Sequence, residues 1–131
     1  SVRLGIDDKV KFCGKIAYED MPQKLTNATI LALSRPNNKQ NQYGFPTKLG
    51  EYLATGNPVV VTSVGEIPAY ILDSENGYLA NPDDVESFAH KLMQAARDLE
   101  IGKDVGCLGK CLVKSSFSSI KQVESVLAIF G

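Results

Sequence analysis

The sequence has few cysteines, a single histidine and no long apolar run, and each shortage excludes a class of protein. Its cysteines, Cys13, Cys107 and Cys111, are odd in number and form no disulfide framework at these spacings. A metal site built on two of them would need further ligands, and His90 is the only histidine. We therefore expect buried or half-buried free thiols, no bound metal and a solvated His90. No apolar run reaches the roughly 18 residues of a membrane-spanning helix.

A large excess of charge of either sign is also missing. The 14 basic and 15 acidic residues give a formal net charge of −1, so we expect no nucleic-acid-binding surface and no polybasic membrane patch. Local groups must then hold any anionic ligand. The 131 residues suit one domain, 1–131. Because no secretory leader is visible and the chain starts without methionine, we expect part of a larger cytoplasmic protein, with the inner membrane surface as the alternative location.

Short apolar runs alternate with longer helical patterns along the chain. Helices are expected at 20–28, 46–55, 66–72 and from 81–84 to about 99, and strands at 10–13, 29–33, 59–62 and 77–80. This alternation predicts an α/β fold, a Rossmann-like parallel sheet with helices on both faces. We expect the first strand of such a unit to lie upstream of Ser1.

The last third of the chain is predicted to be helical. The long helix that ends near residue 99 carries one apolar stripe at helical spacing, made of Val85, Phe88, Ala89, Leu92, Met93, Ala96 and Leu99. Residues 100–131 are expected to form two further helices, separated near residues 115–118.

The clearest candidate for a binding site is the junction where Gly44-Phe45-Pro46 leads into a helix. Ligands of open parallel sheets bind where strands end and loops enter helices. A helix amino end presents unpaired N–H groups and about half a positive charge, which suits a phosphate. Gly44 permits close backbone approach. An ordinary loop-to-helix turn is the alternative interpretation.

The polar face of that helix sharpens the phosphate hypothesis. Thr47, Lys48 and Glu51 lie on it, with Glu51 about one turn beyond the amino end. A carboxylate accepts two hydrogen bonds, and a ribose diol offers two hydroxyls. Lys48 would add positive charge beside a diphosphate, and Arg35 would reach a phosphate or pair with a carboxylate. A simply solvated helix face remains the alternative.

The run from Gly44 to Val60 resembles the signature of the group 1 (family 4) GT-B glycosyltransferases. The strand-then-glycine segment before Gly14 resembles the family's, as do residues 26–35 and the turns at 65–68 and 75–79. The resemblance covers residues 4–99. It implies the C-terminal lobe of a retaining glycosyltransferase, which binds a nucleoside diphosphate sugar and generally needs no metal or other cofactor.

The resemblance also implies roles for single residues. The residue matching Glu51 binds the donor ribose, the segment Gly14-Lys15-Ile16 lies beside the nucleobase, and the turn at Gly44-Phe45 holds phosphate or sugar. The family often has a second glutamate eight positions earlier, where this chain has Tyr43. Gln42, Tyr43 or backbone groups are then expected to contact the sugar instead.

Three functions remain open at this point. The first is the donor-binding lobe, whose partner would be the acceptor-binding N-terminal lobe of the same full-length protein. Alone, this lobe is expected to be inactive, because the chemistry occurs between the lobes. The second is a GT-B-fold nucleotide-sugar epimerase. The third is a non-catalytic α/β interaction domain.

Overall fold

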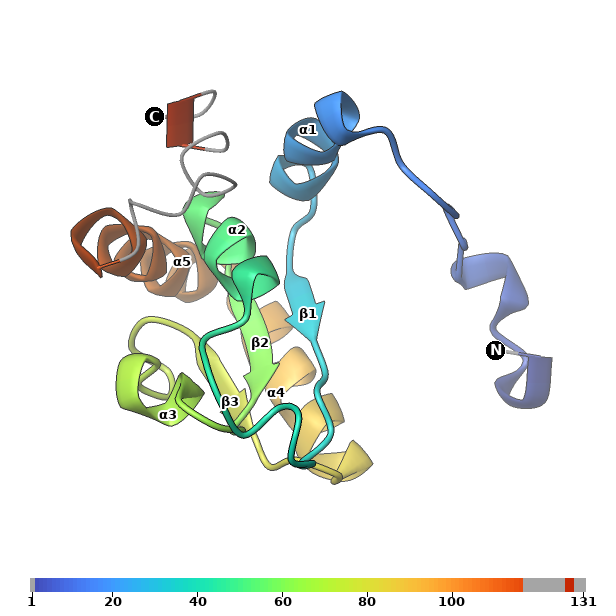
Figure 1. The fold of residues 1–131 in the computed structure, drawn as a ribbon. Coiled ribbons are helices and arrows are strands. Elements are labelled where there is room, and N and C mark those ends of the chain that lie inside the picture. Colours follow the sequence, from blue (N-terminus) through green and yellow to red (C-terminus); the bar gives the residue numbers. More distant parts are fainter. Residues whose placement is uncertain (1, 117–126, 129–131) are drawn as a thin grey trace.

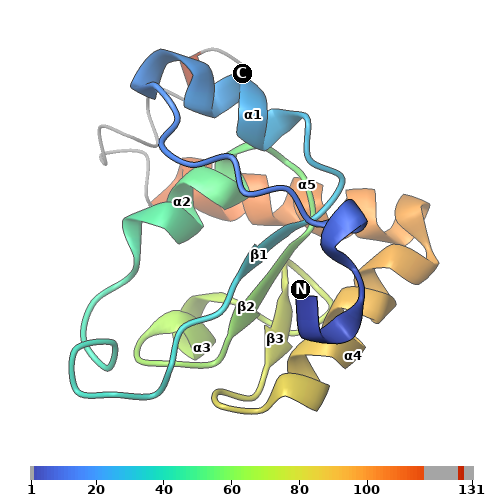
Figure 2. The same ribbon diagram turned by 90° about the vertical axis from the view of Figure 1, so that its right-hand side faces the viewer.

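A computed structural model describes residues 2–116 and 127–128, and its centre is a sheet of three parallel strands (Figure 1, Figure 2). The strands are β1 (Leu31–Leu33), β2 (Val59–Thr62) and β3 (Tyr78–Ala80), and they lie in that order. Because parallel neighbours need a crossover connection, a helix follows each strand. The predicted α/β class is confirmed.

The helices begin and end close to the sequence-based expectations. Pro46 precedes the first turn of α2, and Gly56, at φ +81°, follows its last turn, which matches the preferences of proline and glycine at helix ends. The helical segments among the described residues are η1 (Val2–Leu4), η2 (Asp7–Lys9), η3 (Tyr18–Asp20), α1 (Met21–Thr26), α2 (Thr47–Ala54), α3 (Ile67–Tyr70), α4 (Val85–Arg97) and α5 (Leu99–Ser116). None of these helices has the length and apolarity needed to span a bilayer.

Side chains of β2 alternate between two apolar clusters, one on each face of the sheet. Val59 and Val61 pack in one cluster with residues of α1, α2 and α3, whereas Val60 packs in the other with Ala95 of α4. All four residues of β2 are buried, as expected for a central parallel strand. Helices therefore cover both faces, as predicted.

Glycines bring α5 unusually close to the loops that lead into the strands. A Cβ at Gly106 would stand 2.2 Å from the carbonyl oxygen of Gly56, and one at Gly109 would stand 2.7 Å from that of Asn76. Val105 joins one apolar cluster and Val113 the other. Thus α5 links the cores of the two faces, and only glycine fits at its closest approach.

The predicted strand at residues 10–13 is wrong. The structure shows no regular element there, and Phe12 is 85% exposed. Figure 1 shows the N-terminal arm, residues 2–17, leading away from the sheet. A strand needs a neighbour for its backbone hydrogen bonds. In the described residues β1 pairs only with β2, so residues 10–13 have no ladder to join.

The apolar stripe predicted on the long helix is largely exposed. Val85 and Met93 are 84% and 59% exposed, and Ala95, which is outside the stripe, is the buried residue of α4. Phe88 and Leu92 reach the core partly. The helix meets β2, β3 and α5 through its Ala95 side, so the described elements leave most of the stripe uncovered.

The prediction of buried or half-buried thiols is also wrong, since all three cysteines are exposed. Cys107 and Cys111 lie on α5 opposite the glycine-rich face that packs inward. The solvated His90 is confirmed as exposed. Of the two predicted C-terminal helices, α5 contains the first, while the second falls mostly outside the described residues.

Candidate functional site

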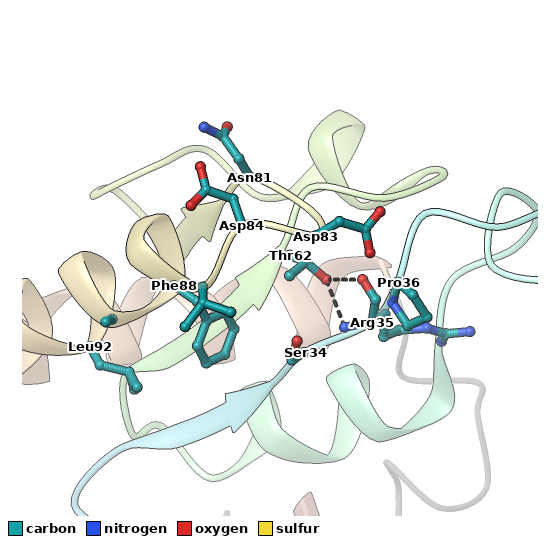
Figure 3. A pocket seen from close by; sticks show the side chains of 11 residues that line it. Ser34, Arg35, Pro36, Thr62, Asn81, Asp83, Asp84, Phe88 and Leu92 are labelled. Atoms are coloured by element: carbon teal, nitrogen blue, oxygen red, sulfur yellow. Dashed lines mark hydrogen bonds between the residues drawn. The ribbon is translucent and has the colours of Figure 1, made fainter. Parts of the chain in front are cut away.

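The site begins where the strands end at one edge of the sheet. Ser34 and Arg35 follow β1, Thr62 closes β2 and Asn81 follows β3. Figure 3 shows these residues around the same strand ends. Parallel strands place their carboxyl ends together, so residues far apart in sequence meet here.

The backbone of Arg35 is held by the side chain of Thr62. The Thr62 hydroxyl accepts a hydrogen bond from the Arg35 backbone N–H at 2.9 Å and donates one to the Arg35 carbonyl oxygen at 2.9 Å. Both bonds are drawn in Figure 3. Thr62 is buried, and a buried hydroxyl needs such partners. The exit of the chain from β1 is thereby fixed to the end of β2.

The loop between β1 and α2, residues 36–45, is folded by its own asparagines. The Asn41 backbone N–H donates to Asn38 Oδ1 at 3.0 Å, and the side-chain Nδ2 of Asn41 donates to the Pro36 carbonyl oxygen at 3.0 Å. The Arg35 guanidinium donates to Asn41 Oδ1. Arg35 therefore turns toward the loop, where its guanidinium bonds the Asn41 side chain. Among the described residues no carboxylate lies within ion-pair distance of it.

A cavity of about 370 Å³ opens between the end of β1 and the amino end of α2. We call it the α2 cavity. Its lining contains two cations, Arg35 and Lys48, among apolar and neutral polar residues. The lining residues are Leu33, Ser34, Arg35, Pro36, Asn41 and Lys48. Since the amino end of α2, where Lys48 lies, adds partial positive charge to that of the two cations, this cavity suits an anion.

Glu51 lies on α2 three residues after Lys48, near the middle of the helix. It is half-buried. Burial raises the pKa of its carboxyl from the ordinary 4.5, and the positive charge of Lys48 offsets part of that rise. Glu51 does not itself line the α2 cavity. A half-buried carboxylate is available to accept hydrogen bonds from a neutral polar group such as a diol.

The turn before α2 mixes exposed and packed residues. Tyr43 is 82% exposed, and Gly44 adopts φ +77°, a conformation that glycine takes without strain. Phe45 packs edge-on against Tyr70 of α3, with ring centroids 5.5 Å apart. Thr47 is exposed at the first position of α2. The aromatic contact anchors the turn while Tyr43 faces solvent.

The predicted nucleobase segment lies elsewhere in this structure. Gly14, Lys15 and Ile16 belong to the N-terminal arm, and Lys15 and Ile16 line a separate cavity of about 550 Å³ with residues of α1. That cavity shares no residue with the α2 cavity. Arg35 and Lys48 are thus brought together, whereas Gly14, Lys15 and Ile16 are not brought to them.

The structure gives roles to residues for which the sequence predicted no individual role. Ser34 and Asn41 line the α2 cavity, and Thr62 fixes Arg35. A third cavity, of about 560 Å³, lies on the α4 side of the same strand ends and also includes Arg35 and Thr62 together with Phe88 and Leu92 (Figure 3). The signal for Thr62 was its position as the polar last residue of an apolar strand.

The fold and the site together define a parallel α/β lobe whose sheet edge carries a small basic cavity at a helix amino end. The family model described as "Glycosyl transferases group 1" matches residues 1–98. This chain therefore belongs to the group 1 glycosyl transferases.

Known proteins of this kind are similar along nearly the whole chain. The N-acetyl-alpha-D-glucosaminyl L-malate synthase of Bacillus anthracis is 28% identical over 127 residues, which are 97% of this chain and 32% of that protein. The mannosylfructose-phosphate synthase of Agrobacterium fabrum is 27% identical over 126 residues, 96% of this chain and 27% of that protein. The chain thus spans about a third or less of these relatives' length.

Solved structures share the fold. The C-terminal domain of the group 1 glycosyl transferase LpcC from Francisella tularensis superposes with a TM-score of 0.76 at 26% identity, covering 88% of this chain and 57% of that one. The Anabaena protein HepE, solved with UDP-glucose, gives a TM-score of 0.77 at 21% identity, covering 98% of this chain and 34% of that one.

Proposed function

We propose that this chain is the donor-binding lobe of a retaining glycosyltransferase that transfers a sugar from a nucleoside diphosphate sugar to an acceptor. One observation carries the proposal: Arg35 and Lys48 line a single cavity at the amino end of α2, with Glu51 one turn further along. Membership in the group 1 family supports a transferase over the epimerase and the non-catalytic domain.

The diphosphate is the part of the donor that the α2 cavity suits best. Each phosphate needs donors and positive charge. The two cations line the cavity, and the N–H groups of Thr47 and Lys48 at the start of α2 would add further donors. The net charge of −1 gives no long-range attraction, so these local groups must provide it. Gly44 and Phe45 shape the turn that would approach the phosphate or the sugar.

Glu51 is the proposed ligand of the ribose. Its position, one turn from the phosphate end, matches the order of phosphate and ribose in a nucleotide. Its carboxylate would accept from both ribose hydroxyls. Thr47 lies on the same polar face, and Tyr43 projects from the preceding turn into solvent, where it would meet the sugar.

The nucleobase is proposed to lie beside Gly14, Lys15 and Ile16. Support comes from the family resemblance of this segment, and a protein with this fold was solved with UDP-glucose. The base would then have to bridge the arm and the α2 cavity, which predicts that nucleotide binding draws the arm toward α2.

The complete reaction is proposed to need the acceptor-binding N-terminal lobe of the full-length protein, so this chain alone should bind donor without turnover. Retention at the anomeric carbon, independence of metal and a cytoplasmic location belong to the same proposal. An epimerase would release a free sugar nucleotide isomer, so product analysis with the full-length protein distinguishes it from the transferase.

The proposal is tested by calorimetric titration of UDP, GDP and ADP into this chain. We expect saturable binding of at least one of them. Lys48→Ala should weaken it about tenfold, the loss of one charge-assisted contact, and Glu51→Gln should weaken it similarly. The matched controls are Lys103→Ala on α5 and Glu86→Gln on α4, both exposed and outside the lining of the α2 cavity. If no diphosphate binds, or if the control pair weakens binding as much, the site is wrongly assigned.

A further inference from the structure

Two residues at the end of β2 act on two residues that line the α2 cavity. The first is Thr62, whose buried hydroxyl bonds both the N–H and the carbonyl oxygen of Arg35. These hydrogen bonds join residues 27 apart in sequence. A hydroxyl can donate and accept a hydrogen bond at the same time, whereas a methyl group can do neither. Valine has the same shape as threonine, so Thr62→Val would remove the hydrogen bonds to both the N–H and the carbonyl oxygen of Arg35.

The second residue is Gly65, which lies against the loop before α2. A Cβ at this position would stand 2.6 Å from the carbonyl oxygen of Asn41 and 3.0 Å from that of Gln42. Both obstacles are backbone atoms, which cannot rotate away as a side chain could. Gly65 also adopts φ +60°, where a side chain is strained. The loop can therefore approach the end of β2 this closely only because residue 65 is glycine.

The effects of Thr62 and Gly65 converge on one contact. Thr62 holds the backbone of Arg35 by hydrogen bonds, and Gly65 leaves room for the backbone of Asn41. The Arg35 guanidinium in turn donates to Asn41 Oδ1. Arg35 and Asn41 then line the α2 cavity together with Lys48. This arrangement orients the Arg35 guanidinium, because the oxygen to which it donates belongs to Asn41, in the loop that packs closely against Gly65.

The loop has little other support on its outer side. Residues 36–40 and 42–44 are exposed, and its bond to the β3–α4 turn, from the Asn37 N–H to Asp83 Oδ2, is long at 3.3 Å. An exposed loop with few buried contacts opens at low free energy. The order of the cavity lining therefore depends on the contacts made at the end of β2.

We propose that Thr62 and Gly65 form a two-point clamp that positions Arg35 and Asn41 for the donor diphosphate without touching the donor. This inference rests on the proposed function of the α2 cavity. Thr62 and Gly65 are positioning residues: they set how well the cavity lining is preorganised, and a preorganised site binds more tightly because less order must be imposed on binding.

Amide exchange of the chain without ligand tests the clamp by itself. The Arg35 backbone N–H should be protected in the unsubstituted chain and in Thr62→Ser, which keeps the hydroxyl, and should exchange freely in Thr62→Val. Gly65→Ala should shift the amide resonances of Asn41 and Gln42. Gly5→Ala is its control, because Gly5 has a similar left-handed φ, +66°, with open space around it. Equal protection of Arg35 in Thr62→Val would overturn the clamp.

Titration with whichever of UDP, GDP and ADP the original chain binds tests what the clamp does. Thr62→Val and Gly65→Ala should each weaken that binding about tenfold, whereas Thr62→Ser should stay within about twofold. The decisive measurement is a double-mutant cycle with Arg35→Ala: if Thr62 acts through Arg35, Thr62→Val should have little further effect in that background. A purely structural role would weaken binding equally in both backgrounds and would overturn the proposal.

The two proposals fail in different ways. If the unsubstituted chain binds no UDP, GDP or ADP while Arg35 exchange still depends on Thr62, the donor-site assignment fails and the clamp has no diphosphate to serve. If a diphosphate binds and Lys48→Ala weakens it, but Thr62→Val and Gly65→Ala bind as tightly as the original chain, the donor site stands and the clamp is wrong.

Discussion

Lys48 and Glu51 lie one turn apart on α2 and act on each other through charge. Burial raises the pKa of the Glu51 carboxyl, and the Lys48 ammonium pulls it partly back. Lys48 is thus placed to serve twice: it lines the α2 cavity, and it helps to keep Glu51 ionised so that the carboxylate can accept hydrogen bonds.

This relationship predicts how nucleotide binding depends on pH. If binding requires ionised Glu51, affinity should fall as pH drops through the folded-state pKa of Glu51, which lies above 4.5. Lys48→Ala removes the charge that lowers this pKa, so the fall should begin at higher pH, whereas Lys48→Arg should leave it in place. UDP affinity measured from pH 4 to pH 8 checks this, with UDP's own phosphate titration subtracted. Unmoved midpoints in Lys48→Ala would contradict the pairing.

The same pKa shift predicts a pH dependence of stability. Because the pKa of Glu51 is higher in the folded chain than in the unfolded one, the folded state binds more protons between the two values. The penalty for ionising Glu51 is therefore absent below 4.5 and complete above the folded-state pKa. Glu51→Gln should gain stability relative to the original chain as pH rises through this window. Urea unfolding at pH 4 and pH 7 measures it, with Glu86→Gln as control.

Gly106 predicts an unusual sign for a glycine-to-alanine substitution within a helix. Alanine normally stabilises a helix by about 1 kcal/mol relative to glycine. At Gly106, however, the new Cβ would stand 2.2 Å from the Gly56 carbonyl oxygen and 2.7 Å from the backbone carbonyl carbon of Asn57. Either α5 or the loop before β2 must therefore shift. Gly106→Ala should destabilise the chain by about 1–3 kcal/mol or more. Thermal unfolding beside Cys107→Ala, an exposed neighbour, provides the comparison.

Much of the fold could be predicted because local signals and tertiary needs agree. Three consecutive valines, residues 59–61, predicted a strand buried on both faces and lie in the central strand β2, and Pro46 and Gly56 mark the ends of α2. The strand predicted at residues 10–13 failed because strand formation depends on a neighbouring backbone. Its apolar alternation said nothing about whether a partner would be present.

Sequence reasoning predicted those site residues whose role follows from their position on a single helix or strand. Lys48 and Glu51 follow from the polar face of one helix, and Arg35 from its place after a strand. Thr62, Asn41 and Gly65 lie in strand-to-helix junctions that the sequence marks as polar and glycine-rich, but their individual roles were not predicted. Those roles depend on contacts between segments far apart in sequence. No local periodicity reports such contacts.

The exposed stripe on α4 predicts a reversal of the usual rule that large apolar residues matter more than alanines. Met93 is 59% exposed, whereas Ala95 is fully buried among residues of β2, β3 and α5. Met93→Gln should change stability by no more than about 0.5 kcal/mol. Ala95→Leu should cost about 1–3 kcal/mol, because the tightly packed interface has no room for three more carbons. Urea unfolding of both variants decides this, and a large loss in Met93→Gln would mean that the stripe is covered.

Asp84 and Ser87 hold the start of α4 through two linked hydrogen bonds. The Ser87 N–H donates to Asp84 Oδ1 at 2.9 Å, and the Ser87 hydroxyl accepts from the Asn81 N–H at 2.9 Å. Asp84→Ala removes the helix cap and should cost about 1 kcal/mol, while Asp84→Ser, a cap of comparable quality, should restore most of it. Ser87→Ala removes only the bond to Asn81.

Both bonds order the same turn, so the two losses should be coupled. The double variant Asp84→Ala/Ser87→Ala should then lose less stability than the sum of the single variants, by about 0.5 kcal/mol or more. Chemical denaturation of the four chains measures this coupling. Additive losses would show that the cap and the β3–α4 turn form independently. The hydrogen bond from Asn37 to Asp83, a residue of this turn, would then not depend on the cap.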